Sequence, residues 1–198
     1  TIARIIAGWG DGAIAAQKVG TQVESISFMI SGGFATAINA FTAQNFGAGR
    51  YDRIQKGFST GAVLMVAWGA FTSVVLIAFP EPLMRLFIQE ADVVEIGASY
   101  LRIMGLAEIF SCLEGLASGM FQGMGHTVPP AVTGMAFNLF RIPAALLLSA
   151  TALGLSGIWW AMSLSMFLKG VVLPIWFILF LRRFMRAHKA APAAEKPA

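Results

Sequence analysis

The sequence has 198 residues, of which 57% are hydrophobic and only 12% are charged. A mean hydropathy of +0.73 is typical of a chain that lies within a lipid bilayer rather than around one aqueous core. The single cysteine, Cys112, excludes an internal disulfide, and no Cys/His cluster has metal-ligand spacing. We therefore expect an all-α integral membrane protein without metal or redox cofactor, whose net charge of +4 reflects membrane orientation and not a nucleic-acid partner.

Five complete membrane spans are expected, because about 20 apolar residues are needed to cross a bilayer. They cover residues 13–44, 54–79, 94–122, 129–152 and 155–182, and residues 1–9 look like the tail of an earlier, sixth helix. Prolines and glycines interrupt the pattern between the spans. Residues 1–184 are then a transmembrane unit, and residues 185–198, which have few bulky apolar groups, are expected to be a disordered tail.

The chain begins in mid-helix at Thr1, without a signal-peptide pattern, so we expect it to be the C-terminal part of a longer protein. Lys and Arg outside the spans predict the orientation, because cytoplasmic loops are enriched in basic residues. Basic residues gather at 50–56 and 182–196, whereas the 80–95 loop is mostly acidic. The first loop and the C-terminus are therefore expected in the cytoplasm. The 82–91 stretch is a candidate for a short amphipathic helix on the outer interface.

Ionisable residues within the spans carry the functional argument. Glu24 lies about ten residues inside its helix, roughly 15 Å deep and near the midplane. Intramembrane charges are costly, and they usually face a protein interior or a water-filled cavity. The remaining charged residues at such positions are Arg102, Glu108, Glu114, Arg141 and Lys169. Three acids and three bases permit either a structural network of pairs or a relay of protons or ions, and both readings stay open.

The surroundings of these residues separate the candidates. Glu24 and Glu114 both stand among small and hydroxyl-bearing residues, which allow close helix contact or room for water. Glu108 and Arg102 point to different faces of one helix and look structural, as does Lys169, which is able to snorkel toward the membrane surface. Pro143 and Pro174 are expected to kink the last two spans.

Three stretches resemble the multidrug and toxic compound extrusion (MATE) family. AQNFGAGRYDRIQKG (43–57) is similar to the family's Q-N-x-G-A-G loop, here Gln44, Asn45, Gly47 and Gly49. GMFQGMGHTVPPAVTGMAFNLFRIPAALLL (119–148) resembles its G-x-G-x-T-x-x-P segment with the later Asn138 and Arg141. GTQVESISFMISGGFATAINAF (20–41) is similar to the matching helix of a bacterial subgroup that carries the same acid.

The resemblance implies that the chain is the C-terminal lobe of a two-lobe transporter, whose N-terminal lobe precedes it. In this family, cationic or amphipathic compounds leave by alternating access as protons or sodium ions enter. Some members carry an ion-site acid at the position of Ser111, and Glu114 lies one turn later here. This departure favours proton coupling through Glu24 or Glu114, with Arg141, Asn138 and Ser111 as further candidates for ion or substrate binding.

We therefore expect a multi-pass antiporter of a bacterial-type plasma membrane, which needs no cofactor beyond the coupling ion. Two alternatives stay open. A related flippase for lipid-linked oligosaccharides would need a basic cavity built from Arg102, Arg141 and Lys169, whereas a scaffold subunit would need no cavity. An enzyme is not expected, because the spans carry no Ser/His or paired-Asp arrangement. The Gln44–Gly49 loop is expected to cap a helix rather than bind substrate.

Overall fold

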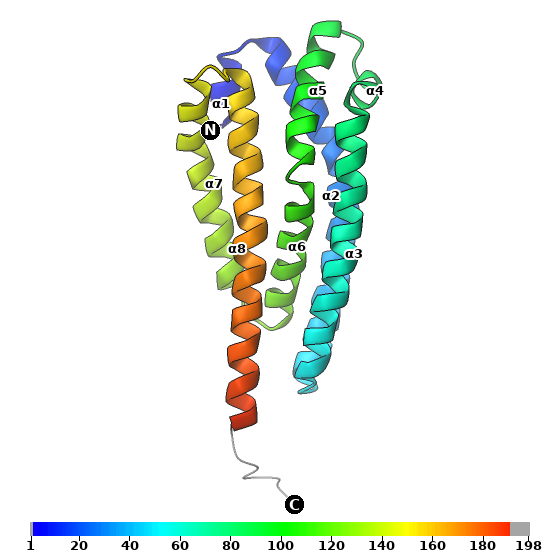
Figure 1. The fold of residues 1–198 in the computed structure, drawn as a ribbon, viewed down its shortest axis with the longest axis vertical. Coiled ribbons are helices and arrows are strands. Elements are labelled where there is room, and N and C mark those ends of the chain that lie inside the picture. Colours follow the sequence, from blue (N-terminus) through cyan, green and yellow to red (C-terminus); the bar gives the residue numbers. More distant parts are fainter. Residues whose placement is uncertain (1, 191–198) are drawn as a thin grey trace, which may run out of the picture.

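Helices form all the regular structure in the computed structural model, which describes residues 2–190 (Figure 1). In chain order they are α1 (Ile2–Ala7), α2 (Asp11–Gly47), α3 (Tyr51–Ala78), α4 (Pro80–Arg85), α5 (Ala91–Gly105), α6 (Glu108–Gly123), α7 (Val128–Ser149) and α8 (Leu155–Ala190). Four of them, α2, α3, α7 and α8, are each long and apolar enough to cross a membrane. The pair α5 and α6 passes the same test as one bent unit, which makes up to five spans.

The span expected over 94–122 is therefore present as this bent unit, but it is not one continuous helix. It is broken at Leu106 and Ala107, where α5 and α6 meet at 52°. No proline lies at the break. Instead, Ser73 of α3 donates a hydrogen bond to the Gly105 carbonyl at 2.6 Å, and a side chain at Gly105 would crowd Ile77. The close approach of α3 holds a carbonyl outside the helical ladder, and local sequence carries no signal for that contact.

The two helix-interior prolines do not interrupt their helices. Pro143 lies within the unbroken assignment of α7, and Pro174 lies within that of α8. The residues before and after each proline remain helical, so the kinks expected there are not accompanied by a break in either helix. Lost hydrogen bonds at these prolines are thus absorbed inside continuous helices.

The end of α8 also differs from the expectation. The helix continues to Ala190, so residues 185–190 are helical and not disordered, while residues 191–198 lie outside the described part of the chain. Phe184, just before this extension, contacts the rings of Phe46, Tyr51 and Phe180 at centroid distances of 5.6, 5.0 and 6.1 Å. The amphipathic helix expected over 82–91 is shorter and earlier, as α4.

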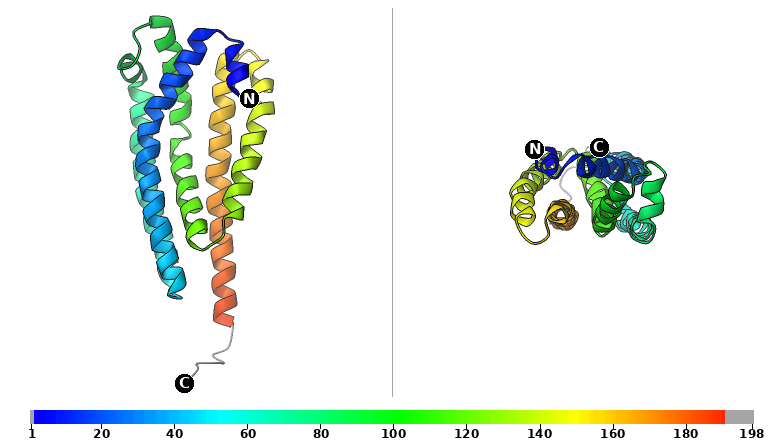
Figure 2. Two further views of the ribbon diagram at one scale, coloured as in Figure 1. Left: turned by 180° about the vertical axis from the view of Figure 1, so that it is seen from behind. Right: turned by 90° about the horizontal axis from the view of Figure 1, so that it is seen from above.

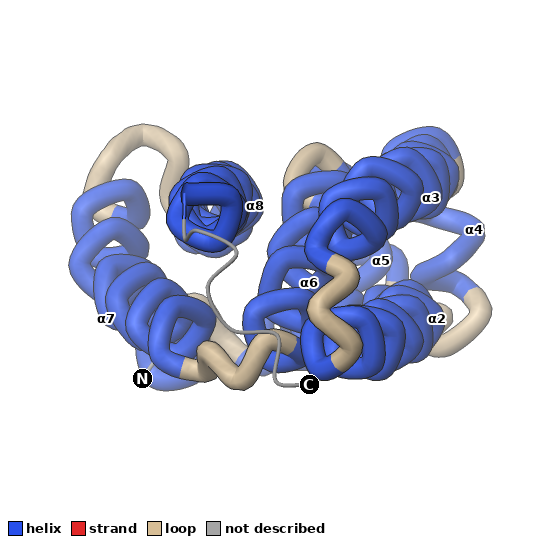
Figure 3. Tube along the Cα trace, turned by 90° about the horizontal axis from the view of Figure 1, so that it is seen from below, coloured by secondary structure: helices blue, strands red, loops and turns tan. Residues whose placement is uncertain are grey.

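The helices stand side by side, with α5 and α6 between the α2–α3 pair and the α7–α8 pair (Figures 1 and 3). Figure 2 shows α2 running alongside both halves of the broken span, and α2 contacts both α5 and α6. Two apolar clusters hold the bundle. One surrounds Tyr100, Leu101 and Trp159, and the other surrounds Leu116, Phe121 and Phe177. Helix α2 passes the break between α5 and α6, and the buried acids near this crossing have polar partners on the neighbouring helix.

Candidate functional site

Glu24 is buried on α2, with only 2% of its surface exposed. Tyr100 of α5 donates its hydroxyl to Glu24 Oε2 at 2.7 Å, whereas Oε1 has no hydrogen-bond partner. The Tyr100 ring is fixed by an edge contact with Trp159, at a centroid distance of 4.9 Å, and by close packing over Gly20. The acid that the sequence places at mid-membrane is thus held by a neutral donor on a neighbouring helix.

Glu108 forms a second, similar arrangement at the start of α6. It is fully buried, and Ser27 of α2 donates to its Oε1 at 2.5 Å while Oε2 has no partner. Ser27 follows Glu24 by three residues, so both lie on one side of α2. The carboxyl groups of Glu24 and Glu108 are close enough to interact electrostatically. Two buried acids, each with one free oxygen, therefore face the same stretch of the bundle.

The sequence favoured a structural role for Glu108, because Glu108 and Arg102 were expected to point to different faces of one uninterrupted helix. The break separates the two residues. Arg102 instead forms an exposed ion pair with Glu81 at 3.4 Å, as its expected outward direction suggested. Glu108 could have been singled out only through its partner Ser27, which lies on another helix. That pairing is visible only when the packing of α2 against α6 is known.

Glu114, the second acid that the sequence favoured, is ion-paired. Its Oε2 lies 3.3 Å from Lys169 Nζ of α8, and both side chains are largely covered. Arg141 of α7 makes no ion pair with Glu24 within the described residues, although it lies near enough to Glu24 and Glu114 to interact with their charges. Its Nε is buried without a hydrogen-bond partner. The structure therefore brings Glu24, Glu114 and Arg141 close enough for their charges to interact.

The other candidates lie apart from direct contact with these acids. Ser111 is half-buried on α6, and Asn138 is exposed on α7. The loop motif ends α2: Asn45 donates its side-chain amide to the Phe41 carbonyl at 2.7 Å, and its own carbonyl accepts from Arg50 at 2.8 Å. Gly49 takes a positive φ of 67°, which glycine adopts at little cost. Gln44 and Gly47 are exposed in the same turn.

Metal ligation has no cluster to support it in the described chain, where no group of three or more His, Cys, Asp or Glu side chains is placed to hold an ion. Cys112 is a free, buried thiol. The chemistry on offer is instead that of buried carboxyl groups next to hydroxyl donors and one unpaired guanidinium nitrogen. Such groups are able to bind and release a proton or a monovalent cation.

A multi-pass helical bundle that holds buried acids beside a broken span has the architecture of an α-helical membrane transporter. The sequence matches the MatE family over residues 1–147, which is most of the chain. The chain belongs to the MatE family.

Relatives and solved structures agree with this assignment. The chain is 28% identical over 171 residues to the "Probable multidrug resistance protein NorM" of Thermotoga maritima, covering 85% of this chain and 37% of that protein. It is 23% identical over 148 residues to human "Multidrug and toxin extrusion protein 1", covering 74% of this chain and 26% of that protein. The chain spans about two fifths, or less, of the length of these curated relatives.

Two solved structures share the fold. A MOP superfamily transporter from Pyrococcus furiosus superposes with a TM-score of 0.83 at 17% identity, over 92% of this chain and 40% of that one. A MATE crystal structure in the bent conformation gives 0.84 at the same identity and the same coverage of both chains. The partial coverage is consistent with the chain being one lobe of a longer transporter.

Proposed function

We propose that the full-length gene product is a secondary antiporter, which exports cationic or amphipathic organic compounds in exchange for protons by alternating access. The single observation that carries this proposal is the pair of buried acids, Glu24 on α2 and Glu108 beside the α5–α6 break, which are near enough to interact electrostatically. Each acid has one hydroxyl donor, and neither forms an ion pair among the described residues. The relatives described as a probable multidrug resistance protein and as a multidrug and toxin extrusion protein support the substrate class.

The electrostatics of the pair explain how coupling would work. Two ionised carboxylates in a low-dielectric site repel each other, so binding a proton or a cation between them is favoured. An organic cation that reaches the site competes with the proton for the same free oxygens. Release of one therefore accompanies binding of the other, which is the requirement for exchange.

Glu114 is the second candidate for coupling. Its ion pair with Lys169 joins α6 to α8, and protonation of Glu114 would release Lys169. Arg141 lies within electrostatic range of Glu24 and Glu114, so it would respond to the charge of either. Sodium remains the alternative coupling ion, because oxygens of Glu24, Glu108 and Ser27 are suitable ligands for a hard cation. The choice between proton and sodium is made by the experiment below.

The test uses the full-length gene product in inverted membrane vesicles, with ethidium as the lipophilic cation and a pH gradient or a sodium gradient imposed separately. Proton-driven transport is expected in the parent, and Glu24→Gln and Glu108→Gln are each expected to reduce it by at least about tenfold, the effect of losing 1.4 kcal/mol. Glu81→Gln is the matched control, because it removes an exposed acid from the Arg102 pair. Unchanged proton-driven transport in both buried variants would return these acids to a structural role.

The flippase alternative depends on positive charge. The MOP superfamily transporter from Pyrococcus furiosus is described as having a binding pocket of reverse polarity that suggests a different function. In this chain Arg102 pairs with Glu81 and Lys169 with Glu114, which leaves Arg141 as the intramembrane base without an acidic contact in the described residues. The two buried acids without an ion pair, Glu24 and Glu108, outnumber the one unpaired base, Arg141, among the described residues. This excess of negative charge favours a cationic substrate. Absence of efflux under either gradient would make the flippase the function to test next, ahead of a non-transport scaffold.

A further inference from the structure

A groove runs between α2 and α3 on the surface of the bundle, near the ends of these helices that the Gly47–Tyr51 loop joins. It encloses about 460 Å³ and is lined by Ile38, Phe41, Arg53, Lys56, Thr60 and Leu64, together with two glycines of α3. The lining is polar at the loop end and apolar toward the centre of the bundle. A ligand that fits such a gradient has a charged end and an apolar body.

Gly57 and Gly61 shape the floor of the groove. A Cβ at position 57 would collide with the ring of Phe41, and one at position 61 would lie 2.7 Å from Leu116 Cδ1 of α6. These glycines let α2, α3 and α6 approach closely, which leaves a narrow slot bounded by side chains of α2 on one side. The apolar side chains along this slot favour contact with hydrocarbon, because removing apolar surface from water is stabilising.

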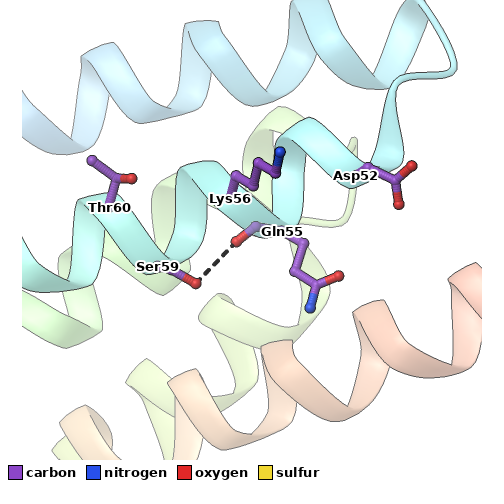
Figure 4. A pocket seen from close by; sticks show the side chains of 5 residues that line it. All are labelled: Asp52, Gln55, Lys56, Ser59 and Thr60. Carbon is purple, nitrogen blue, oxygen red and sulfur yellow. Dashed lines mark hydrogen bonds between the residues drawn. The ribbon is translucent and has the colours of Figure 1, made fainter.

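Arg53 and Lys56 supply unneutralised positive charge at the loop end. Neither forms an ion pair within the described chain, and both are exposed. Figure 4 shows Lys56 and Thr60 directed toward one side of α3, and Gln55 and Ser59 toward another. Asp52 lines the adjoining hollow together with Lys56 but points away from it (Figure 4), and no ion pair joins the two among the described residues.

The dimensions fit the membrane. Arg53 and Leu64 are eleven residues apart on α3, which is about 16 Å at the rise of an α-helix. The positive-inside rule assigns the loop end to the cytoplasmic surface. The groove therefore runs from headgroup level to about the middle of a hydrocarbon core roughly 30 Å thick. Basic pockets between helices on the cytoplasmic side are suited to anionic headgroups.

We propose that this groove binds one anionic phospholipid of the cytoplasmic leaflet. Its phosphate lies between Arg53 and Lys56, and one acyl chain follows the slot past Phe41 to Leu64. The site is distinct from the buried acids, and its occupation does not depend on the transport activity proposed above. A lipid seated here joins α2 to α3 and would stiffen the helix that carries Glu24 and Ser27.

The experiment is native mass spectrometry of the detergent-purified full-length gene product titrated with dioleoylphosphatidylglycerol or dioleoylphosphatidylcholine. We expect one tightly retained phosphatidylglycerol and weaker retention of phosphatidylcholine. Arg53→Gln and Lys56→Gln are each expected to weaken phosphatidylglycerol binding about fivefold, the value of one basic residue near a membrane surface. The double variant Arg183→Gln with Arg186→Gln is the control, because it removes two exposed charges from the same end of the bundle.

A second variant separates a lipid from a simple anion. Thr60→Trp keeps both charges and fills the slot, so it is expected to weaken phosphatidylglycerol retention while leaving the protein monodisperse. Inorganic phosphate at equal concentration is expected not to displace the lipid. The inference is overturned if Arg53→Gln, Lys56→Gln and the α8 control have equal effects. It is also overturned if phosphate displaces the lipid and Thr60→Trp has no effect, which would indicate a headgroup-sized anion site.

Discussion

Hydroxyl groups stand beside both buried acids, and their position on different helices gives them a structural role in joining those helices. Tyr100 on α5 serves Glu24 of α2, and Ser27 on α2 serves Glu108 of α6. The two hydrogen bonds thus run in opposite directions between α2 and the broken span. A buried carboxyl group that loses its single donor keeps the full cost of desolvation. Each hydroxyl therefore contributes more than a surface hydrogen bond would.

Ser27→Ala tests this contribution directly. Without the Ser27 hydroxyl neither oxygen of Glu108 has a partner, so the variant is expected to lose about 1–3 kcal/mol of stability. Ser31→Ala is the control one turn along α2, because the Ser31 hydroxyl donates to the Phe28 carbonyl of its own exposed helix face. That change is expected to stay within about 0.5 kcal/mol. Thermal unfolding of the purified full-length protein measures both, and equal midpoints would show that Ser27 does not support Glu108.

Helices in this bundle approach one another through glycine. Gly170 of α8 packs against the backbone of Phe110 on α6, and a Cβ there would overlap the Phe110 carbonyl oxygen. The neighbouring rings of Phe110 and Phe167 meet edge-on at 4.3 Å. Backbone cannot move aside as a flexible side chain does, so the contact depends on the missing side chain. At the same contact between α6 and α8, Lys169, the residue before Gly170, forms its ion pair with Glu114.

Gly170→Ala is therefore expected to destabilise the protein by about 1–3 kcal/mol through overpacking. Gly134→Ala on α7 is the matched change, because nothing lies within 4 Å of a Cβ built there. In that variant the better helix propensity of alanine is expected to leave stability unchanged or to raise it by about 0.5–1 kcal/mol. The comparison is read from unfolding midpoints in one detergent. A Gly170 variant as stable as the Gly134 variant would contradict the close α6–α8 contact.

The spans were predictable because bilayer thickness sets their length, and proline or glycine marks most of their ends. The break at Leu106 and Ala107 was not predictable, since it depends on Ser73 reaching the Gly105 carbonyl from another helix. The sequence pattern pointed to kinks at Pro143 and Pro174, which lie in continuous helices, and gave no sign of the break at Leu106 and Ala107. Local chemistry locates residues that permit a break, whereas tertiary contacts decide where one forms.

The candidate site was only partly predictable, because local sequence shows depth along one helix but not which residues of neighbouring helices meet. Depth along one helix identified Glu24 as an unusual acid, and the structure buries it. Glu108 and Tyr100 were not singled out, because their roles depend on how α5 and α6 lie against α2. Arg141 was expected as a candidate for ion or substrate binding, and it lies near enough to Glu24 to interact with its charge without forming an ion pair. Pairing across helices is the information that one sequence does not contain.

The bundle as a whole exposes many large apolar side chains, among them Met29, Val63, Leu139 and Leu147. Such side chains favour contact with lipid or with another apolar surface, and helices α2, α3, α7 and α8 all carry them. The charged loops then set the direction of insertion. The orientation decides which leaflet the α2–α3 groove faces and from which side protons reach Glu24, so it affects both proposals.

Single cysteines at three exposed positions test that orientation, in a full-length background that lacks other cysteines. Ala48→Cys lies in the loop after α2, Gln89→Cys lies between α4 and α5, and Ala187→Cys lies near the end of α8. A membrane-impermeant maleimide applied to intact cells is expected to label position 89 alone, because acidic residues surround it and basic residues surround the other two. Positions 48 and 187 are expected to react after the membrane is permeabilised. Labelling of 48 and 187 in intact cells, with 89 protected, would reverse the orientation and place Arg53 and Lys56 against the outer leaflet. Cytoplasmic anionic lipid could not then reach the groove, and the proton gradient would meet Glu24 from the opposite side.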